Sequence, residues 1–264
     1  MKIKERWGYL KTILEISNRW LHRPEAEREL AYLLSRVPSR VYIDKLMFGY
    51  FPPTQTSFIE FMDEFGIITK EDPNPIFEEL NIVYPYYSKK KSFFHNNTLL
   101  IPFFDVYGNV LSMSGRTMLS EDEMKEKKVS KYKHLSFEKR YHLFGLDRSC
   151  RNIVEEDRVV IVEGQFDCYS TYFAGIKNVV GLCGSKLTPQ QILLLKRFTN
   201  NFCLILDTDE AGIEGYTKAK KQAKKYKFSI EGLTVPNGKD IDDFAKDSNW
   251  NISTYDLKRL DDVI

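Results

Sequence analysis

Strand-like and helix-like segments alternate along residues 158–235, and this rhythm constrains the fold more than any other feature of the sequence. Short strand-like runs occur four times, and a segment with helical spacing follows each of the first three. The runs are RVVIVEG (158–164), IKNVVGL (176–182), FCLILD (202–207) and SIEGLTV (229–235). Alternation at this interval is typical of βαβ units, so it predicts an α/β fold with a Rossmann-like, mainly parallel sheet.

The first half of the chain has a mixed pattern. Residues 5–35 have helical spacing on both sides of Pro24, and residues 58–68 return to that spacing. Residues 97–118 predict two strands around a Tyr-Gly-Asn turn. We therefore expect a mixed α/β subdomain over residues 1–155 and a parallel-sheet subdomain over residues 156–264, facing a shared cleft.

Composition excludes several classes of protein. The chain has 264 residues, a formal net charge of +2, and hydrophobic and charged fractions of 42% and 29%, which are ordinary for a soluble globular protein. No apolar run reaches the roughly 18 to 20 residues that span a bilayer, and the first residues lack the apolar core of a signal peptide. We expect a cytoplasmic protein with no membrane partner.

The cysteines argue against a zinc site. Cys150, Cys168, Cys183 and Cys203 stand far apart, and none forms a CxxC pair. We therefore expect reduced thiols and no zinc in this chain.

Acidic side chains follow three of the four predicted strands. Glu163 closes the first strand, and Asp207 closes the third with Asp209 two residues on. A further group comes after the fourth: Asp240, Asp242 and Asp243. The carboxyl ends of parallel strands meet at one edge of the sheet, where ligands bind. Like charges gathered there repel, and a hard divalent cation relieves that repulsion, because carboxylates, waters and substrate phosphates together hold Mg²⁺. The sequence predicts a Mg²⁺ or Mn²⁺ site.

Taken singly, the acidic residues also fit structural roles. Asp209 suits the start of a helix through the helix dipole, and Asp240 is a candidate N-cap for the segment IDDFAK. A calcium loop is disfavoured, because position 12 of DTDEAGIEGYTK is Lys218 instead of glutamate. An Asp-x-Asp after a strand resembles the start of haloacid-dehalogenase-type phosphatases, but there the motif usually follows the first strand. Acidic groups at several strand ends favour a shared metal site.

Four motifs in order resemble the TOPRIM fold of DnaG-type primases, type IA and type II topoisomerases and some nucleases. They are IVEGQFDCYS (161–170), GLCGSKLT (181–188), LILDTDEAG (204–212) and GKDIDDF (238–244). Upstream segments are similar to those of the bacterial DnaG-type primase polymerase core: residues 31–53, 101–116 and 130–149. The resemblance runs from about residue 25 to about residue 247.

This resemblance implies a DNA primase, a nucleotidyltransferase with DNA-directed RNA polymerase activity that makes RNA primers for DNA replication. It implies single-stranded DNA as template, ribonucleoside triphosphates as substrates, and as primosome partners a replicative helicase and a separate zinc-module subunit. The acidic residues that it assigns to the Mg²⁺ or Mn²⁺ site are Glu163, Asp207, Asp209, Asp240 and Asp242, of which the first three are catalytic. The basic residues that it assigns to template or nucleotide binding are Arg116, Lys131 and Lys139.

The sequence departs from the family pattern in two respects. We expect the zinc-ribbon and helicase-binding domains to be absent from this chain. In addition, Asn96, Asn97 and Thr98 stand where the family has basic residues, and SKY (130–132) replaces Pro-Lys-Tyr. These changes bear on start-site recognition and processivity, and they leave the metal residues in place.

Two other functions stay open. The chain also fits another TOPRIM nuclease or phosphotransferase, and a non-catalytic replisome subunit that binds single-stranded DNA or a helicase. Arg116, Lys131 and Lys139 also fit exposed surface charges, the ordinary state of such residues. A scaffold gains nothing from crowded carboxylates beside a polyanion, which favours the enzyme. The Lys-, Asn- and Tyr-rich composition suggests an AT-rich genome, such as that of a phage or plasmid in a bacterial cell.

Overall fold

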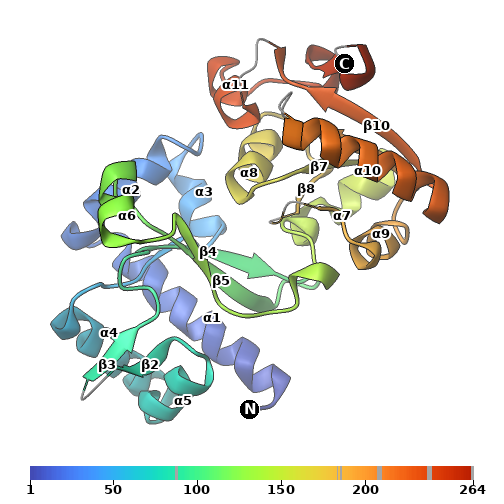
Figure 1. Cartoon of the computed structure of the whole chain (residues 1–264). Coiled ribbons are helices and arrows are strands. Elements are labelled where there is room, and N and C mark those ends of the chain that lie inside the picture. The colour runs from blue at the N-terminus through green and yellow to red at the C-terminus, as the bar shows by residue number, and fades with distance from the viewer. Residues whose placement is uncertain (87–88, 183, 185, 207–209, 237–239, 263–264) are drawn as a thin grey trace. The chain divides into compact units, whose positions relative to one another are not determined.

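The computed structural model describes the chain apart from residues 87–88, 183, 185, 207–209, 237–239 and 263–264, and apart from the side chains of residues 84–86, 89–91 and 211. The chain divides into two compact units (Figure 1). Unit 1 comprises Met1–Ser35, Ser39–Phe103 and Asn109–Phe137. Unit 2 comprises Arg36–Pro38, Phe104–Gly108 and Glu138–Ile264.

Unit 1 combines helices with a four-stranded sheet. Its helices are α1 (Ile3–Trp20), η1 (Pro24–Ala26), α2 (Glu27–Leu34), α3 (Arg40–Lys45), α4 (Gln55–Thr69), α5 (Pro73–Glu79) and α6 (Glu121–Lys127). The sheet has the order β1 (Gly49–Tyr50), β4 (Leu99–Phe104), β5 (Val110–Arg116) and β6 (Tyr132–His134). Strands β2 (Val83–Tyr86) and β3 (Lys89–Ser92) form a separate antiparallel pair. The predicted break between two helices at Pro24 is confirmed.

The predicted hairpin of residues 97–118 is confirmed by β4 and β5. Its turn is tightened by Asp105, whose Oδ1 accepts the backbone N–H of Tyr107 at 2.8 Å and whose carbonyl accepts that of Gly108 at 3.0 Å. Gly108 has a φ of 82°, a left-handed conformation that glycine adopts without a Cβ clash. The turn therefore needs glycine at this position.

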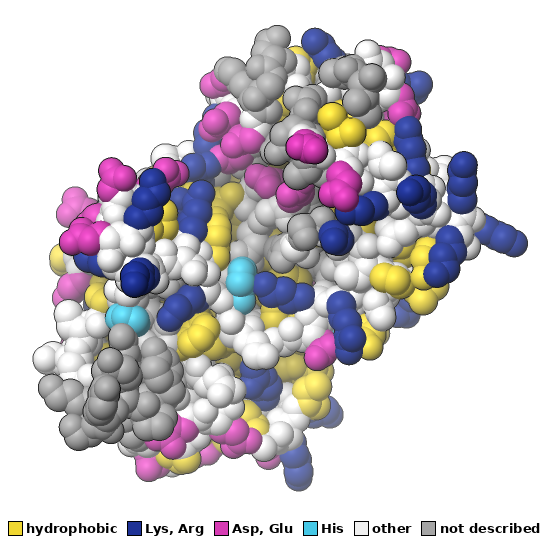
Figure 2. Space-filling view, in the orientation of Figure 1, with side chains coloured by type: hydrophobic (Ala, Val, Ile, Leu, Met, Phe, Trp, Pro, Cys, Tyr) yellow, Lys and Arg dark blue, Asp and Glu magenta, His cyan; other side chains and the backbone are white. Residues whose placement is uncertain are grey.

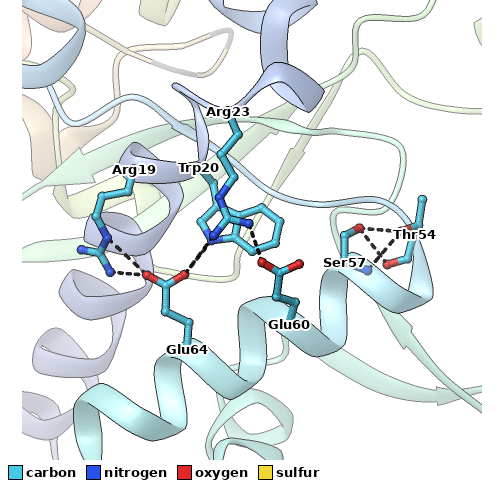
Figure 3. Close-up of polar contacts among 7 residues, drawn as sticks. All are labelled: Arg19, Trp20, Arg23, Thr54, Ser57, Glu60 and Glu64. Carbon is cyan, nitrogen blue, oxygen red and sulfur yellow. Dashed lines mark hydrogen bonds and ion pairs between the residues drawn. The ribbon is translucent and has the colours of Figure 1, made fainter.

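Helix α4 is held against α1 by polar contacts that surround Trp20 (Figure 3). The indole N–H of Trp20 donates to Glu64 Oε2 at 2.8 Å, and Arg19 Nε donates to Glu64 Oε1 at 3.2 Å. Arg23 stacks with its guanidinium carbon 3.7 Å from the Trp20 ring centroid and donates to Glu60 at 2.7 Å. At the start of α4, Thr54 caps the helix by accepting a hydrogen bond from the backbone N–H of the third helical residue.

Unit 2 is built on a five-stranded sheet flanked by helices (Figure 1). Its helices are η2 (Lys139–Tyr141), α7 (Leu146–Glu155), α8 (Gln165–Phe173), α9 (Pro189–Leu195), α10 (Glu210–Tyr226), α11 (Ile241–Asp247), η4 (Thr254–Asp256) and η5 (Leu260–Asp262). Its strands are β7 (Val159–Val162), β8 (Val179–Gly181), β9 (Asn201–Ile205), β10 (Ser229–Thr234) and β11 (Lys258–Arg259). The order is β11-β10-β9-β7-β8, and only β11 is antiparallel to its neighbour among these described strands. The predicted α/β fold with a mainly parallel sheet is confirmed.

The core of unit 2 explains why β7 is apolar along its whole length. All four residues of β7 are buried, as expected for a parallel sheet covered on both faces. Ile161 and Leu204 pack in one cluster with residues of α7, α9 and α10. Leu146 and Ile153 of α7 are 2% and 0% exposed in that cluster, so α7 belongs to unit 2, although the predicted boundary at residue 155 assigns it to the first subdomain.

Along the described residues, no helix combines the length and the apolar character that crossing a membrane requires.

Gly115 in β5 lies where surrounding atoms leave no room for a side chain. A Cβ there would lie 2.4 Å from Phe94 Cδ1 and 2.6 Å from the carbonyl oxygen of Asn97. Gly115→Ala is expected to lower the free energy of unfolding by about 1–3 kcal/mol, as overpacking does, and urea unfolding followed by circular dichroism measures this. The matched control is Gly8→Ala in α1, where a Cβ meets nothing within 4 Å and alanine favours the helix. Equal stability of the two variants would contradict the packing argument.

Glu64 makes the folding stability of unit 1 dependent on pH. Burial alone would raise the pKa of Glu64, but hydrogen bonds from Arg19 and Trp20 and the positive charges of Arg19 and Arg23 together hold the pKa below the usual value of 4.5. A carboxylate with a lowered pKa in the folded state stabilises the fold above its unfolded pKa, and this stabilisation disappears as the pH falls through the folded value.

Glu64→Gln is therefore expected to lower the melting temperature at pH 7, and the difference from the unmodified chain is expected to shrink as the pH falls below 4.5. Thermal melts across this range measure both effects. Glu15→Gln, which removes an exposed partner of Lys11 in α1, serves as the control. A deficit for Glu64→Gln that stays constant from pH 7 to pH 3 would contradict the assignment.

Candidate functional site

Glu163 stands at the carboxyl end of β7, where the strand turns into α8. Its side chain is exposed. The turn is closed by Asp167, whose Oδ2 accepts the backbone N–H of Gly164 at 2.8 Å. A Cβ at Gly164 would lie 2.7 Å from that same oxygen, so a larger residue there would displace the Asp167 carboxylate. The Glu-Gly pair therefore presents a carboxylate at the sheet edge and starts the helix at once.

Three carboxylate residues line one cavity at this edge. Glu163, Asp167 and Asp240 surround a volume of about 230 Å³, whose remaining described walls are the apolar residues Val162, Ile205, Val235 and Ile241. These walls come from the ends of β7, β9 and β10 and from the start of α11, so the predicted meeting of strand ends is observed. Figure 2 shows acidic side chains gathered on the visible face of unit 2.

Two predicted ligands, Asp207 and Asp209, lie outside the described residues, and one lining residue was not predicted. Asp167 was quoted within the TOPRIM-like motif but not assigned to the site. Its position in the first turn of the helix that starts directly after Glu163 and Gly164 is the signal that indicates its proximity.

Asp240 is both a helix cap and a wall of the cavity. One oxygen of its exposed carboxylate accepts the backbone N–H of Asp243 at 2.7 Å, which confirms the predicted N-cap of α11. Its other oxygen accepts no hydrogen bond from the described residues. A carboxylate has enough lone pairs to cap a helix and bind a cation together.

Asp242 is placed differently, although it lies only two residues further on. It is 2% exposed and is not among the described residues that line the cavity. Its Oδ2 accepts a hydrogen bond from Lys246 at 2.6 Å and forms an ion pair with Arg36, and its Oδ1 accepts the hydroxyl of Ser170. The role of Asp242 as a direct metal ligand stays a prediction.

The residues at this edge fit a hard divalent cation. One ligand atom from each of Asp240, Asp242 and Asp243 falls within 4.8 Å of the others, but helix capping and ion pairs account for that cluster. The cavity between Glu163, Asp167 and Asp240 offers carboxylate oxygens beside open space. Oxygen donors with room for water are what Mg²⁺ and Mn²⁺ require.

Two predicted basic residues lie together at an edge of the unit 1 sheet. Arg116 ends β5 opposite Tyr132 of β6, and Lys131 immediately precedes Tyr132. The guanidinium carbon of Arg116 lies 4.1 Å from the ring centroid of Tyr32, and Nη1 donates to the carbonyl of Thr117 at 3.0 Å. The buried Nε of Arg116 has no hydrogen-bond partner within the described part of the chain. Stacking fixes the plane of a side chain that suits phosphate.

Lys131 and Lys139 are held through their backbones. The side chain of Lys131 is exposed, and its carbonyl accepts the backbone N–H of Thr117 at 3.0 Å. Lys139 is half-buried in η2 of unit 2, where its carbonyl accepts a hydrogen bond from Gln191 Nε2 at 3.3 Å. Arg116 and Lys131 therefore share unit 1, and Lys139 belongs to unit 2.

The neutral residues before β4 have structural roles. The side-chain amide of buried Asn97 donates to the carbonyl of Ser130 at 3.0 Å, next to Lys131. The hydroxyl of Thr98 donates to the buried carboxylate of Glu29. The Asn97 contact thus fixes the segment that carries Lys131, and the Thr98 contact joins the start of β4 to α2.

Known proteins match both halves of the chain. A family model described as "DNA primase catalytic core, N-terminal domain" matches residues 16–150, and a model described as "Toprim-like" matches residues 160–245. A DNA primase of Synechococcus elongatus is 31% identical over 239 residues, which cover 86% of this chain and 33% of that protein. The chain thus spans about a third of the length of this relative.

Solved structures share the fold. The zinc-binding and RNA polymerase domains of the Aquifex aeolicus primase match with a TM-score of 0.79 and 24% identity, covering 100% of this chain and 64% of that one. A DnaG primase catalytic domain bound to single-stranded DNA matches with a TM-score of 0.78 and 20% identity, covering 97% and 82%. The predicted resemblance is confirmed: this chain belongs to the family of DnaG-type DNA primase catalytic cores.

Proposed function

We propose that this chain is the polymerase core of a DNA primase, which copies single-stranded DNA into short RNA primers from ribonucleoside triphosphates with Mg²⁺ or Mn²⁺. The observation that carries the proposal is the cavity that Glu163, Asp167 and Asp240 line at the carboxyl edge of the unit 2 sheet. Family membership of both halves of the chain supports it. A structurally similar DnaG primase catalytic domain has been solved bound to single-stranded DNA, which supports single-stranded DNA as the template.

Primer synthesis joins a ribose 3′-oxygen to the α-phosphorus of the incoming nucleotide. The bond from that phosphorus to the bridging oxygen breaks, and pyrophosphate leaves with the electron pair. When bound, divalent cations stabilise the attacking and leaving oxygens. In our proposal Asp240 holds a cation through the oxygen that its cap leaves open, with Asp207 and Asp209 as further ligands. Glu163 either holds a cation or accepts the 3′-hydroxyl proton.

The basic residues are proposed to bind phosphates. Arg116, with its plane fixed over Tyr32, is suited to grip two phosphate oxygens at once. Lys131 and Lys139 act as point charges toward the template or the nucleotide. A replicative helicase and a separate zinc-module subunit are further proposed partners, by analogy with the family.

One assay separates the candidate functions. The chain is incubated with single-stranded DNA, labelled ribonucleotides and Mg²⁺ or Mn²⁺. Labelled oligoribonucleotides are expected, since they identify a primase. Shortened DNA would identify a nuclease, and retained DNA without any product would identify a binding subunit, so either result would overturn the proposal.

Glu163→Gln is expected to reduce primer synthesis about 100-fold or more, because the loss of a cation ligand or proton acceptor removes several kcal/mol of transition-state stabilisation. Binding of single-stranded DNA, measured by fluorescence anisotropy, should be retained. Glu155→Gln at the end of α7, which removes an exposed partner of Arg151, is the matched control. A synthesis rate for Glu163→Gln equal to that of the control would remove Glu163 from the active site.

Arg116→Lys keeps the positive charge but loses the forked, stacked guanidinium. We expect this variant to bind nucleotide or template phosphate several-fold more weakly, and Arg116→Ala more weakly still, as for a lost charge-assisted bidentate contact. Titration with labelled template and with nucleotide measures both. Lys125→Ala, which removes an exposed charge from α6 of the same unit, is the control. If Arg116→Lys bound both ligands as the unmodified chain does, a phosphate contact through the guanidinium fork would be excluded.

A further inference from the structure

The buried carboxylate of Asp242 connects three separate segments of unit 2. Asp242 lies in the first turn of α11, Ser170 lies on α8, and Arg36 comes from the short segment Arg36–Pro38 that belongs to this unit. The side chain of Asp242 is 3% exposed and that of Arg36 is 28% exposed. The guanidinium carbon of Arg36 also lies 6.0 Å from the ring centroid of Phe166 on α8.

The partners of Asp242 have different mechanical consequences. Lys246 lies one turn further along α11 itself, so its contact adds positive charge without fixing the helix against anything else. Arg36 and Ser170 lie outside α11, so their contacts tie the start of this helix to α8 and to the Arg36 segment. These two contacts therefore help to fix the start of α11, in addition to the packing of its buried residues Ile241 and Ala245.

The two helices joined in this way carry the carboxylates of the cavity. Glu163 and Gly164 lead directly into α8, and Asp167 is in its first turn. Asp240 is the N-cap of α11, two residues before Asp242. A shift of α11 relative to α8 would change the spacing between Asp240 and Glu163.

We propose that Arg36 is a positioning residue of the metal cavity, which acts through Asp242 to fix the start of α11 against α8. The inference rests on the proposed function only in taking Glu163 and Asp240 as holders of a divalent cation. Mg²⁺ and Mn²⁺ sites depend on well-placed oxygens, and residues that orient metal ligands change metal affinity about 10- to 100-fold when they are removed. Arg36 thus controls how tightly the cavity holds its cation without touching that cation.

The experiment is a Mn²⁺ titration of the full chain, with free Mn²⁺ measured by electron paramagnetic resonance. Arg36→Ala is expected to raise the dissociation constant about tenfold, and Arg36→Lys, which keeps the charge, is expected to recover part of the affinity. In the primer assay, Arg36→Ala should need more metal for half-maximal rate but approach the unmodified rate when metal is saturating. If Arg36 served only the stability of the fold, its loss would not raise the metal concentration for half-maximal rate while leaving the rate at saturating metal unchanged.

Arg151→Ala is the matched control, because Arg151 is an arginine of the same unit whose pair with Glu155 is exposed. If circular dichroism shows that Arg36→Ala does not fold, Ser170→Ala removes the other outside contact of Asp242 and should also weaken Mn²⁺ binding. Unchanged Mn²⁺ affinity in Ser170→Ala and in whichever arginine variants fold would overturn the inference. If the unmodified chain bound Mn²⁺ but made no RNA, only the proposed function would be overturned. The effect of Arg36 on Mn²⁺ affinity would still be tested.

Discussion

Repulsion among carboxylates at the edge of the unit 2 sheet is the constraint on which this site depends. Burial of apolar strands places these groups together: β7 is buried along its whole length, and the side chains that end β7, β9 and β10 share one cavity. The hydrophobic free energy of the sheet offsets the cost of gathering like charges. The carboxylates that line the cavity are at least partly accessible to solvent, which lessens that cost until a cation binds.

Carboxylates in this region are accommodated in two different ways. Asp242 is buried, and it is surrounded by two cations and a hydroxyl, as a charge removed from water requires. Asp240, two residues earlier, stays exposed and uses one oxygen to cap its helix. The same short motif thus supplies one residue that fixes the helix and one that faces the cavity.

Much of the fold of unit 2 could be predicted, because its signals are local. The apolar runs identified its parallel strands, and the Tyr-Gly-Asn turn likewise identified the β4–β5 hairpin of the unit 1 sheet. Contacts between distant segments could not be predicted. No periodicity connects Arg36 to Asp242, and nothing local shows that α7 packs in the core of unit 2. Asp167 was missed because a carboxylate in the first turn of a helix is common for reasons unrelated to a site.

A crystal of the unmodified chain grown or soaked with Mn²⁺, and measured at a wavelength where manganese scatters anomalously, tests the central claim most directly. The account predicts an anomalous peak within coordination distance of Glu163 and Asp240, in the cavity that they line with Asp167. A peak confined to some other part of the molecule, or a fully ordered cavity that holds no peak at saturating Mn²⁺, would contradict it.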